Sequence, residues 1–420
     1  MEKDKILKNI LLDTIPANAR NIGSVNLGYE ITKNKFDLEY CHWRDVLDSI
    51  PEIIYANIFY PTHIFNLIGF LKRNNIPLLK NERVTKIIVG GQGVSNLNGC
   101  LNDIVDEIFL GESDGTEIDK KGWFRKKEIT SDPIIKNKKA VIELTRGCKY
   151  KCSFCEYSWV HGGKFREKDI ALVKEQVDFV KNNGINQVNF LSANFGSYGD
   201  LEELGSYCDI NKIRVLNSDL CLRDFDQAKN VFGKRSSIKV GVESFDEITR
   251  KSVNKQMSDE NLLKFFYSAI NYTSNIHCYL IFGLPNDNYQ KWFDWLKTIS
   301  DMRKQIERPI RIEFNITNFE PCLGTPLENA NMVNFEEKDI FLKEWINNLV
   351  DLGFRKKRGD HEITYKNSGG RLGRKEKSYK LLMNLKTQDS KITNAIIGAF
   401  SNGVGRSILD KQADKFLDLL

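Results

Sequence analysis

The sequence predicts an α/β protein built from parallel strands and intervening helices, with a doubly wound, Rossmann-like N-terminal domain. Two patterns predict this class: short apolar runs that end in turn residues, and segments between them with apolar residues at helical spacing. The length of 420 residues is a third indication, because it is enough for two or three domains. We place the domains at residues 1–130, 131–330 and 331–420.

Composition limits the class of protein further. Hydrophobic residues make up 41% and charged residues 28% of the chain, as in soluble globular proteins. No apolar run approaches the roughly 20 residues that span a bilayer, and the first residues lack the apolar core of a signal peptide. The nine cysteines are mostly isolated, which fits a reducing compartment better than a disulfide framework. We therefore expect a cytoplasmic protein without a membrane segment.

The N-terminal domain is predicted from three short apolar runs and one amphipathic helix. The expected strands are Ile10–Asp13, Ile53–Phe59 and Lys86–Gly91. The segment Thr62–Arg73 carries its apolar residues on one helical stripe. A further run, Glu107–Glu112, completes the alternation of strands and helices.

The segment Gly115–Lys139 is rich in charge and poor in apolar pattern. It predicts a linker that contains a short hairpin, and this interpretation is favoured over a binding role.

Strand and helix patterns resume after the linker. Six strands are expected, at Ala140–Thr145, Gln187–Leu191, Lys212–Leu216, Ser237–Val242, Ile276–Phe282 and Ile310–Phe319. Expected helices between them include Lys168–Asn182, Asp259–Tyr272 and Tyr289–Gln305. The second domain is therefore a repeat of strand and helix units, in which polar groups at the C-terminal ends of the strands gather at one end.

Three cysteines follow the first of these strands. Cys148, Cys152 and Cys155 have the spacing C-x3-C-x2-C, and thiolates at such spacing select zinc, copper(I) or an iron–sulfur cluster. The other cysteines lie singly, so none supplies the second pair of a zinc ribbon: Cys41, Cys100, Cys208, Cys221, Cys278 and Cys322. A site with three thiolates leaves one coordination position open. A structural zinc ion or unliganded thiols remain the alternatives.

The spacing, the aromatic Phe154 before the last cysteine, and the strand before and helix after the loop resemble the radical S-adenosylmethionine superfamily. The resemblance implies a partial (β/α)6 TIM-type barrel, a 4Fe-4S cluster on the three cysteines and a cofactor contact for Phe154. It also implies reductive cleavage of S-adenosyl-L-methionine (SAM) to a 5′-deoxyadenosyl radical, which attacks a substrate C–H position. An electron donor such as flavodoxin or ferredoxin is implied as a partner, and the catalytic residue stays unknown.

Other strand ends add to the resemblance. The segment Gly241–Ser244 is similar to a family segment beside SAM, which implies cofactor contacts for Glu243 and Ser244; a surface glutamate is the alternative. Family-like turns occur at Phe282–Pro285 and Pro321–Pro326.

Two strand ends depart from the family pattern or match it weakly. The family's G-G-E string after the second strand is absent, and Asn194 takes its place. After the third strand, Asn217 or Ser218 would bind the ribose, unless they cap a turn.

The N-terminal segments Val89–Val94 and Asp106–Glu112 resemble the cobalamin-binding-like domain that precedes many radical SAM cores. In that family a D-x-H-x-x-G motif supplies a histidine to cobalt, and this string is absent; the region holds only His42 and His63. We therefore expect either no cobalamin or cobalamin without a histidine ligand. A cobalamin-dependent radical SAM methyltransferase is the alternative function.

The last ninety or so residues predict a small basic C-terminal domain. Between Arg355 and Lys391, twelve basic residues face four acidic ones. Such a segment indicates a nucleic acid or another phosphorylated, polyanionic substrate, with a solvated basic surface as the alternative. A function of another class is also open, namely a non-catalytic metal- or cluster-binding protein that binds nucleic acid.

Overall fold

In the computed structural model the chain divides into two compact units, one within Met1–Lys127 and the other within Glu128–Leu372. The structure describes residues 9–14, 23–36, 38–59, 63–96, 102–118, 122–160, 164–217, 219–232, 237–308, 310–319, 321–322, 325–331, 335–353 and 363–367. Ser218 and most of the basic segment between Arg355 and Lys391 lie outside these ranges. No helix in the described ranges is both long enough and apolar enough to cross a bilayer.

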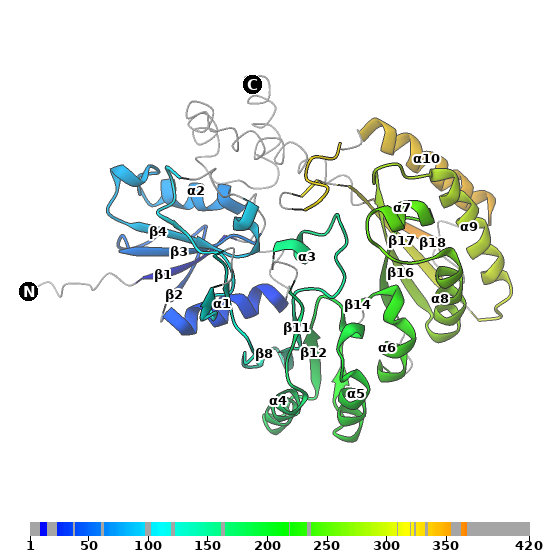
Figure 1. The fold of residues 1–420 in the computed structure, drawn as a ribbon, viewed down its shortest axis with the longest axis horizontal. Helices are drawn as coiled ribbons and strands as arrows, with labels where there is room; N and C mark the ends of the chain where they lie inside the picture. Colours follow the sequence, from blue (N-terminus) through cyan, green and yellow to red (C-terminus); the bar gives the residue numbers. More distant parts are fainter. Residues whose placement is uncertain are drawn as a thin grey trace, which may run out of the picture. The chain divides into compact units, whose positions relative to one another are not determined.

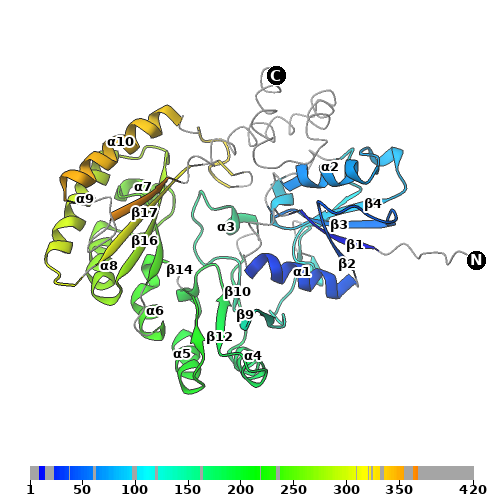
Figure 2. The ribbon, with the colours of Figure 1, turned by 180° about the vertical axis from the view of Figure 1, so that it is seen from behind.

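The first unit is a five-stranded parallel sheet with the order β2-β1-β3-β4-β5. Its strands are β1 (Ile10–Asp13), β2 (Glu39–His42), β3 (Ile53–Asn57), β4 (Lys86–Gly90) and β5 (Glu107–Ile108). Helices α1 (Gly23–Phe36) and α2 (Ile64–Arg73) lie on opposite faces of this sheet (Figures 1 and 2). Two short 3-10 turns, Lys80–Glu82 and Gln92–Asn96, flank β4.

Alternation along β1 explains the two covered faces. Leu11 packs with Tyr29 of α1, whereas the next residue, Leu12, belongs to the cluster that contains Phe65 of α2. A sheet with helices on both faces is the doubly wound arrangement, and its strand order reverses between β1 and β3. Strand β2 has no apolar run, since Glu39 and Tyr40 are exposed, and the sequence pattern did not predict it.

A short hairpin and the start of the second unit follow. Strands β6 (Glu117–Ile118) and β7 (Phe124–Arg125) pair antiparallel within the predicted linker. Strand β8 (Ile134–Lys136) then pairs antiparallel with β9 (Lys139–Glu143).

The second unit alternates parallel strands with helices. One sheet has the order β13-β12-β9-β8 and another has the order β14-β15-β16-β17-β18. The strands are β9 (Lys139–Glu143), β12 (Gln187–Leu191), β13 (Arg214–Val215), β14 (Asp219–Leu220), β15 (Ile238–Glu243), β16 (Asn275–Phe282), β17 (Arg311–Asn318) and β18 (Ile363–Asn367). The helices are α3 (Glu156–Val160), α4 (Ile170–Asn182), α5 (Leu201–Ile210), α6 (Phe225–Phe232), α7 (Glu247–Ser252), α8 (Asp259–Tyr272), α9 (Tyr289–Lys304) and α10 (Phe335–Asp351).

The core of the second unit lies between its strands and its helices. Along β16, Ile276, Cys278, Leu280 and Phe282 alternate into a cluster that also contains Trp292 of α9. Figure 1 shows helices α4, α5, α6, α8 and α9 on one side of the strands. We call the opposite side, which carries the alternate residues of β15, β16 and β17, the inner face.

The predicted third strand, Lys212–Leu216, is shorter and is interrupted. Strand β13 pairs with β12 and β14 pairs with β15, so the two sheets meet at the residues between β13 and β14. Asn217 bridges this break: its Nδ2 donates to the Phe190 carbonyl at 2.6 Å, and its Oδ1 accepts from the Phe190 N–H at 2.8 Å. The side-chain amide thus replaces a pair of strand hydrogen bonds.

The second unit extends beyond residue 330, where the sequence predicted a domain boundary. Trp345 of α10 is fully buried, with ring centroids 5.8 Å from Trp292 and 5.5 Å from Phe314. Strand β18 continues the sheet by pairing parallel with β17. Residues 335–353 and 363–367 therefore belong to the second unit rather than to a separate domain, because the apolar stripe of α10 completes the core of the second unit.

Candidate metal and cofactor site

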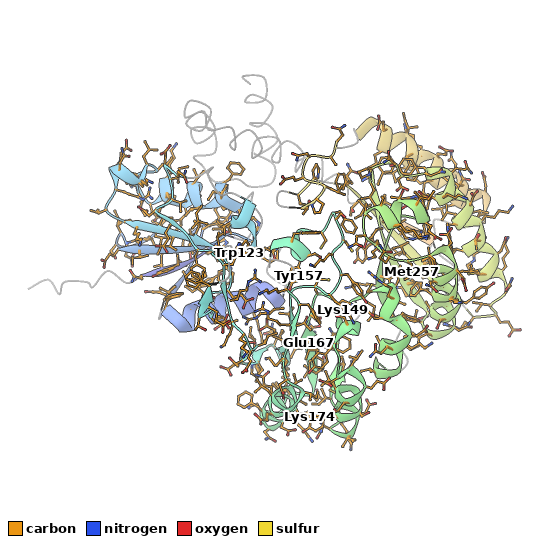
Figure 3. The ribbon with its side chains drawn as sticks, in the orientation of Figure 1. Trp123, Lys149, Tyr157, Glu167, Lys174 and Met257 are labelled. Atoms are coloured by element: carbon orange, nitrogen blue, oxygen red, sulfur yellow. The ribbon has the colours of Figure 1, made fainter. Side chains whose placement is uncertain are left out.

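The cysteine loop lies between β9 and α3 on the inner side of the strands. It begins after β10 (Thr145–Arg146), which pairs antiparallel with β11 (Arg166–Glu167). Gly147 has a φ of +75°, and a Cβ there would lie 2.2 Å from the Lys164 carbonyl oxygen, so this turn requires glycine. Figure 3 shows Lys149, which follows Cys148, and Tyr157, which comes two residues after Cys155, on the side of the strands away from α4 and α5.

One side of the cysteine loop contacts the segment that follows β14, which in turn contacts the segment that follows β12. The Tyr150 hydroxyl lies 2.7 and 2.9 Å from the two carboxylate oxygens of Asp224, to which it donates. The same carboxylate accepts a hydrogen bond from Asn194 Nδ2. The Arg223 guanidinium lies 3.6 Å from the centre of the Tyr150 ring. These contacts fix the position of the loop between Cys148 and Cys152.

The other side is tied to the turn that follows helix α7. The Ser153 N–H donates to the Val253 carbonyl at 2.9 Å, and Asn254 Nδ2 donates to the Lys151 carbonyl at 2.7 Å. The Cys152 sulfur lies 3.9 Å from the Asn254 carbonyl oxygen. The loop is therefore held from both sides before any metal binds.

The three thiols interact with one another electrostatically. Burial raises the pKa of Cys148, and it raises the pKa of Cys152 to about 12, with Cys155 adding to the increase in both cases. Within the described ranges, no three His, Cys, Asp or Glu side chains lie close enough to hold one metal ion. Three neighbouring thiols are ligands that suit a cluster in which each cysteine binds a different iron.

A buried ion pair lies beside this loop. Glu243 ends β15 with a φ of +67°, after a shift in its register with β16. Its Oε1 accepts from Lys255 Nζ at 2.9 Å, and the two side chains are 12% and 11% exposed. Burial opposes the charge of Lys255, but Glu243 and the thiols of Cys221 and Cys152 raise its pKa overall. A charged pair is thus held next to Cys152.

Ser244 points into the core instead of toward this pair. It is fully buried, and its hydroxyl donates to Asp287 Oδ1 at 2.7 Å and accepts from the Asp246 N–H at 2.9 Å. The Trp292 Nε1 lies 3.3 Å from the same hydroxyl. The enclosed hydroxyl, whose hydrogen bonds are already made, favours a structural role for Ser244 over the predicted cofactor contact.

Other residues that were predicted to contact the cofactor also make contacts within the protein. Phe154 packs against Val253, Leu284 and Phe319, where it supports the cysteine loop. Asn194 uses its Nδ2 on Asp224 and its Oδ1 on the Cys221 N–H, at 3.1 Å for the latter. The Asn194 amide is engaged at both ends, which favours a role in positioning the loop.

Asn217 is likewise engaged at both ends by Phe190, which favours the structural alternative over ribose binding. Ser218 lies outside the described ranges.

Three site residues were not found from the sequence. Lys255 lies 12 residues after Glu243, in a polar segment that predicts a solvated turn. Tyr150 and Asp224 are 74 residues apart, so no local pattern connects them. Only the fold brings these side chains to the cysteine loop.

Comparison with known proteins finds a family model that matches part of the chain. Residues 142–299 match the model of the radical SAM superfamily. The uncharacterized protein MJ0966 of Methanocaldococcus jannaschii is 20% identical over 311 residues, which are 66% of this chain and 68% of that protein. The ribosomal protein uS12 methylthiotransferase RimO of Desulfotalea psychrophila is 22% identical over 174 residues, 41% of this chain and 37% of that protein.

A solved structure is similar over almost the whole chain. It is the radical S-adenosylmethionine methyltransferase TsrM from Kitasatospora setae, with cobalamin and a [4Fe-4S] cluster bound. The TM-score is 0.52 at 10% identity, and the match covers 98% of this chain and 99% of TsrM. The likeness shows a common fold.

Proposed function

This chain is a radical SAM enzyme, and we propose that Cys148, Cys152 and Cys155 hold its 4Fe-4S cluster while Glu243 and Lys255 bind SAM. The bound cluster supplies the electron that cleaves SAM into methionine and a 5′-deoxyadenosyl radical. The observation that carries the proposal is a loop of three thiols, held from both sides, beside a buried pair of opposite charges.

The ion pair suits the amino-acid end of SAM. That end carries one ammonium group, which the Glu243 carboxylate can bind, and one carboxylate group, which the Lys255 ammonium can bind. Each has hydrogen-bonding capacity left, because the ammonium has three donors and the carboxylate several acceptor positions. In the described part of the chain, the only hydrogen bond of either charged group is the one between them. Binding would thus add contacts without breaking an existing network.

Substitution of single cysteines tests the cluster assignment. We expect Cys152→Ala to lose iron binding after anaerobic reconstitution with iron and sulfide. A 4Fe-4S cluster with one iron free for SAM needs three cysteine ligands, and this variant retains only two. Cys278→Ala is the control, because Cys278 is fully buried in the core away from the loop. Full iron content in Cys152→Ala would refute the assignment, and stoichiometric zinc without SAM cleavage would favour a structural metal site.

A cobalamin-dependent methyl transfer is the second candidate function. It is supported by the similarity to TsrM, whose structure contains cobalamin, over 98% of this chain. The first unit also has a reversal of strand order between β1 and β3, where α/β sheets commonly bind ligands. Expression with excess cobalamin followed by gel filtration tests this candidate. Co-elution at one cobalamin per chain would make methyl transfer the leading function.

The substrate class that we propose is polyanionic, for example a nucleotide within a nucleic acid. The support is the basic segment between Arg355 and Lys391. Each phosphate that this segment neutralises would steepen the salt dependence of binding by about 0.7 to 0.9 in logarithmic slope. We would compare the full chain with the combined variant Arg374→Gln, Lys375→Gln and Lys377→Gln, which leaves β18 intact. Equal, salt-independent binding by both would refute this substrate class.

A further inference from the structure

Cys221 follows β14, and its side chain is directed to the inner face. Leu220, the residue before it, is buried in the core under the helices. Successive side chains of a strand point to opposite faces, so Cys221 points away from that core. Leu220 is paired with Val240 in the parallel register of β14 and β15. The next pair along is therefore Cys221 and Gly241.

The space at Gly241 is taken by the ion pair. A Cβ on Gly241 would lie 2.2 Å from Glu243 Oε1 and 3.2 Å from Lys255 Nζ. Glu243 and Lys255, which we assign to SAM, thus fill the position next to Cys221 on the adjacent strand β15. Electrostatics agree, because burial lowers the pKa of Lys255 whereas Glu243 and then Cys221 raise it. The thiol therefore lies beside the ion pair, and its residue is held by Asn194 on the side of the cysteine loop.

The Cys221 thiol has no evident role in the fold. Cys208 and Cys278 are 1% and 0% exposed in the core, whereas Cys221 is only partly buried. Its backbone N–H donates to Asn194 Oδ1 at 3.1 Å, which holds the residue in place. In the ranges that the structure describes, no hydrogen bond involves its sulfur. A positioned thiol with a free S–H bond is therefore present in the site.

An S–H bond is weaker than the C–H bonds of a substrate and the O–H bonds of water, so a thiol gives up a hydrogen atom to a carbon radical when water does not. We propose that Cys221 donates its thiol hydrogen atom to a carbon-centred radical in this site, an inference that rests on the proposed cleavage of SAM. A C–H bond forms, the S–H bond breaks, and the cysteine becomes a thiyl radical. One electron from the one-electron carrier that reduces the cluster, with one proton from water, restores the thiol.

This role makes a prediction that needs no substrate. The proposed 5′-deoxyadenosyl radical, formed without substrate, takes its hydrogen from the nearest donor. Thiol protons exchange with solvent, so 5′-deoxyadenosine made in D2O carries one deuterium if Cys221 is that donor. The assay is anaerobic, uses a chemical reductant and contains no added thiol. Mass spectrometry of the 5′-deoxyadenosine gives the readout.

We expect most of the product from the unsubstituted protein to be singly deuterated. Cys221→Ser, which keeps the shape but replaces the weak S–H bond, is expected to reduce this fraction at least several-fold. Cys208→Ala is the matched control, because it removes a thiol from the helix side of the same unit and leaves deuteration unchanged. Undeuterated 5′-deoxyadenosine from the unsubstituted protein would overturn the inference while leaving the proposed function intact.

Failure of the proposed function looks different, because no 5′-deoxyadenosine forms at all. Iron content separates a third case: loss of iron in Cys221→Ser would make Cys221 a cluster ligand and would overturn its role as hydrogen donor. Alkylation gives an independent readout that does not depend on the variant folding. In iron-loaded protein, SAM is expected to slow iodoacetamide labelling of Cys221 several-fold, and an unchanged rate would contradict its place beside SAM.

Discussion

Two buried charged groups at the C-terminal ends of strands in the second unit look alike in sequence but differ in their hydrogen bonds. Glu143 ends β9, and its two oxygens accept from Arg146 Nε at 2.9 Å, from Arg146 Nη2 at 3.0 Å and from the Ser131 hydroxyl. Lys168 completes this network through Ser131 and Gln176. Glu243 ends β15 and accepts one hydrogen bond, from Lys255.

The difference teaches how to separate a structural charge from a binding charge. Both carboxylates are largely buried, so burial does not distinguish them. The Glu143 network leaves little capacity for a ligand, because its oxygens already face three donors. The pair of Glu243 and Lys255 keeps hydrogen-bond donors and acceptors that a zwitterionic ligand can use. The Glu243 backbone also has a left-handed conformation, which costs energy. Remaining hydrogen-bonding capacity, rather than burial, therefore distinguishes the two carboxylates.

The largest expected effect comes from Glu143→Gln. Both oxygens of the Glu143 carboxylate accept hydrogen bonds from Arg146 or Ser131. In glutamine, an NH2 group replaces one of these oxygens and faces a donor. We expect a loss of roughly 3 kcal/mol in the free energy of unfolding, at the lower end for breaking a buried ion pair. Denaturant unfolding measures it. Glu175→Ala on the exposed side of α4 is the control, with an expected change within about 0.5 kcal/mol. Equal effects of the two variants would contradict the structural reading of Glu143.

The reverse pattern is expected for Glu243→Gln. A glutamine can direct its carbonyl to Lys255 and its amide to the unused side, so the loss of unfolding free energy is about 1 kcal/mol. SAM binding is expected to weaken by about 1.5 to 3 kcal/mol, because a charged hydrogen bond is lost. Calorimetry on the iron-loaded protein measures the affinity. Glu260→Gln, in an exposed pair with Lys264, leaves it unchanged. Unchanged affinity in Glu243→Gln would return this residue to a structural role.

The same comparison shows which parts of the molecule the sequence could predict. Strands β1 and β12 and helix α8 were predicted because their signals are local, namely apolar runs and helical spacing, and the short spacing of the three cysteines placed them on one loop. The break between β13 and β14 depends on Asn217 reaching Phe190, and the position of α10 depends on Trp345 reaching Trp292. Glu243 could be predicted from its motif, but Lys255 could not, since their contact depends on the turn between them. Long-range contacts, rather than residue types, set this limit.

Asp287, which accepts a hydrogen bond from the Ser244 hydroxyl, is a third carboxylate, and its ionisation extends the comparison to pH dependence. Burial raises the pKa of Asp287 from 3.8 to about 6, although hydrogen bonds from Ser244 and Trp292 oppose the shift. The folded protein therefore prefers the neutral acid, so its contribution to stability is full at low pH and is lost as pH rises through about 6. We expect the free energy of unfolding to fall by about 1 to 2 kcal/mol between pH 5 and pH 7 relative to Asp287→Asn. Parallel pH profiles of the two proteins would refute this ionisation.

The smallest expected effect is that of Tyr150→Phe, which tests whether the cysteine loop is held by hydrogen bonds outside the cluster. Burial and Asp224 raise the pKa of Tyr150, so its hydroxyl stays protonated as a donor to the Asp224 carboxylate. Phenylalanine keeps the ring beside Arg223 and removes only this hydrogen bond, with an expected loss of about 1 kcal/mol. The cluster should still assemble but release iron to a chelator several-fold faster, because the loop opens more often. Tyr207→Phe is the matched control: its hydroxyl bonds both oxygens of Asp178 at 2.7 Å, away from the cysteine loop, between helices α5 and α4. If both variants release iron at the rate of the unsubstituted protein, the cluster itself holds the loop, and the contacts of Tyr150 and Asp224 add only to the stability of the fold.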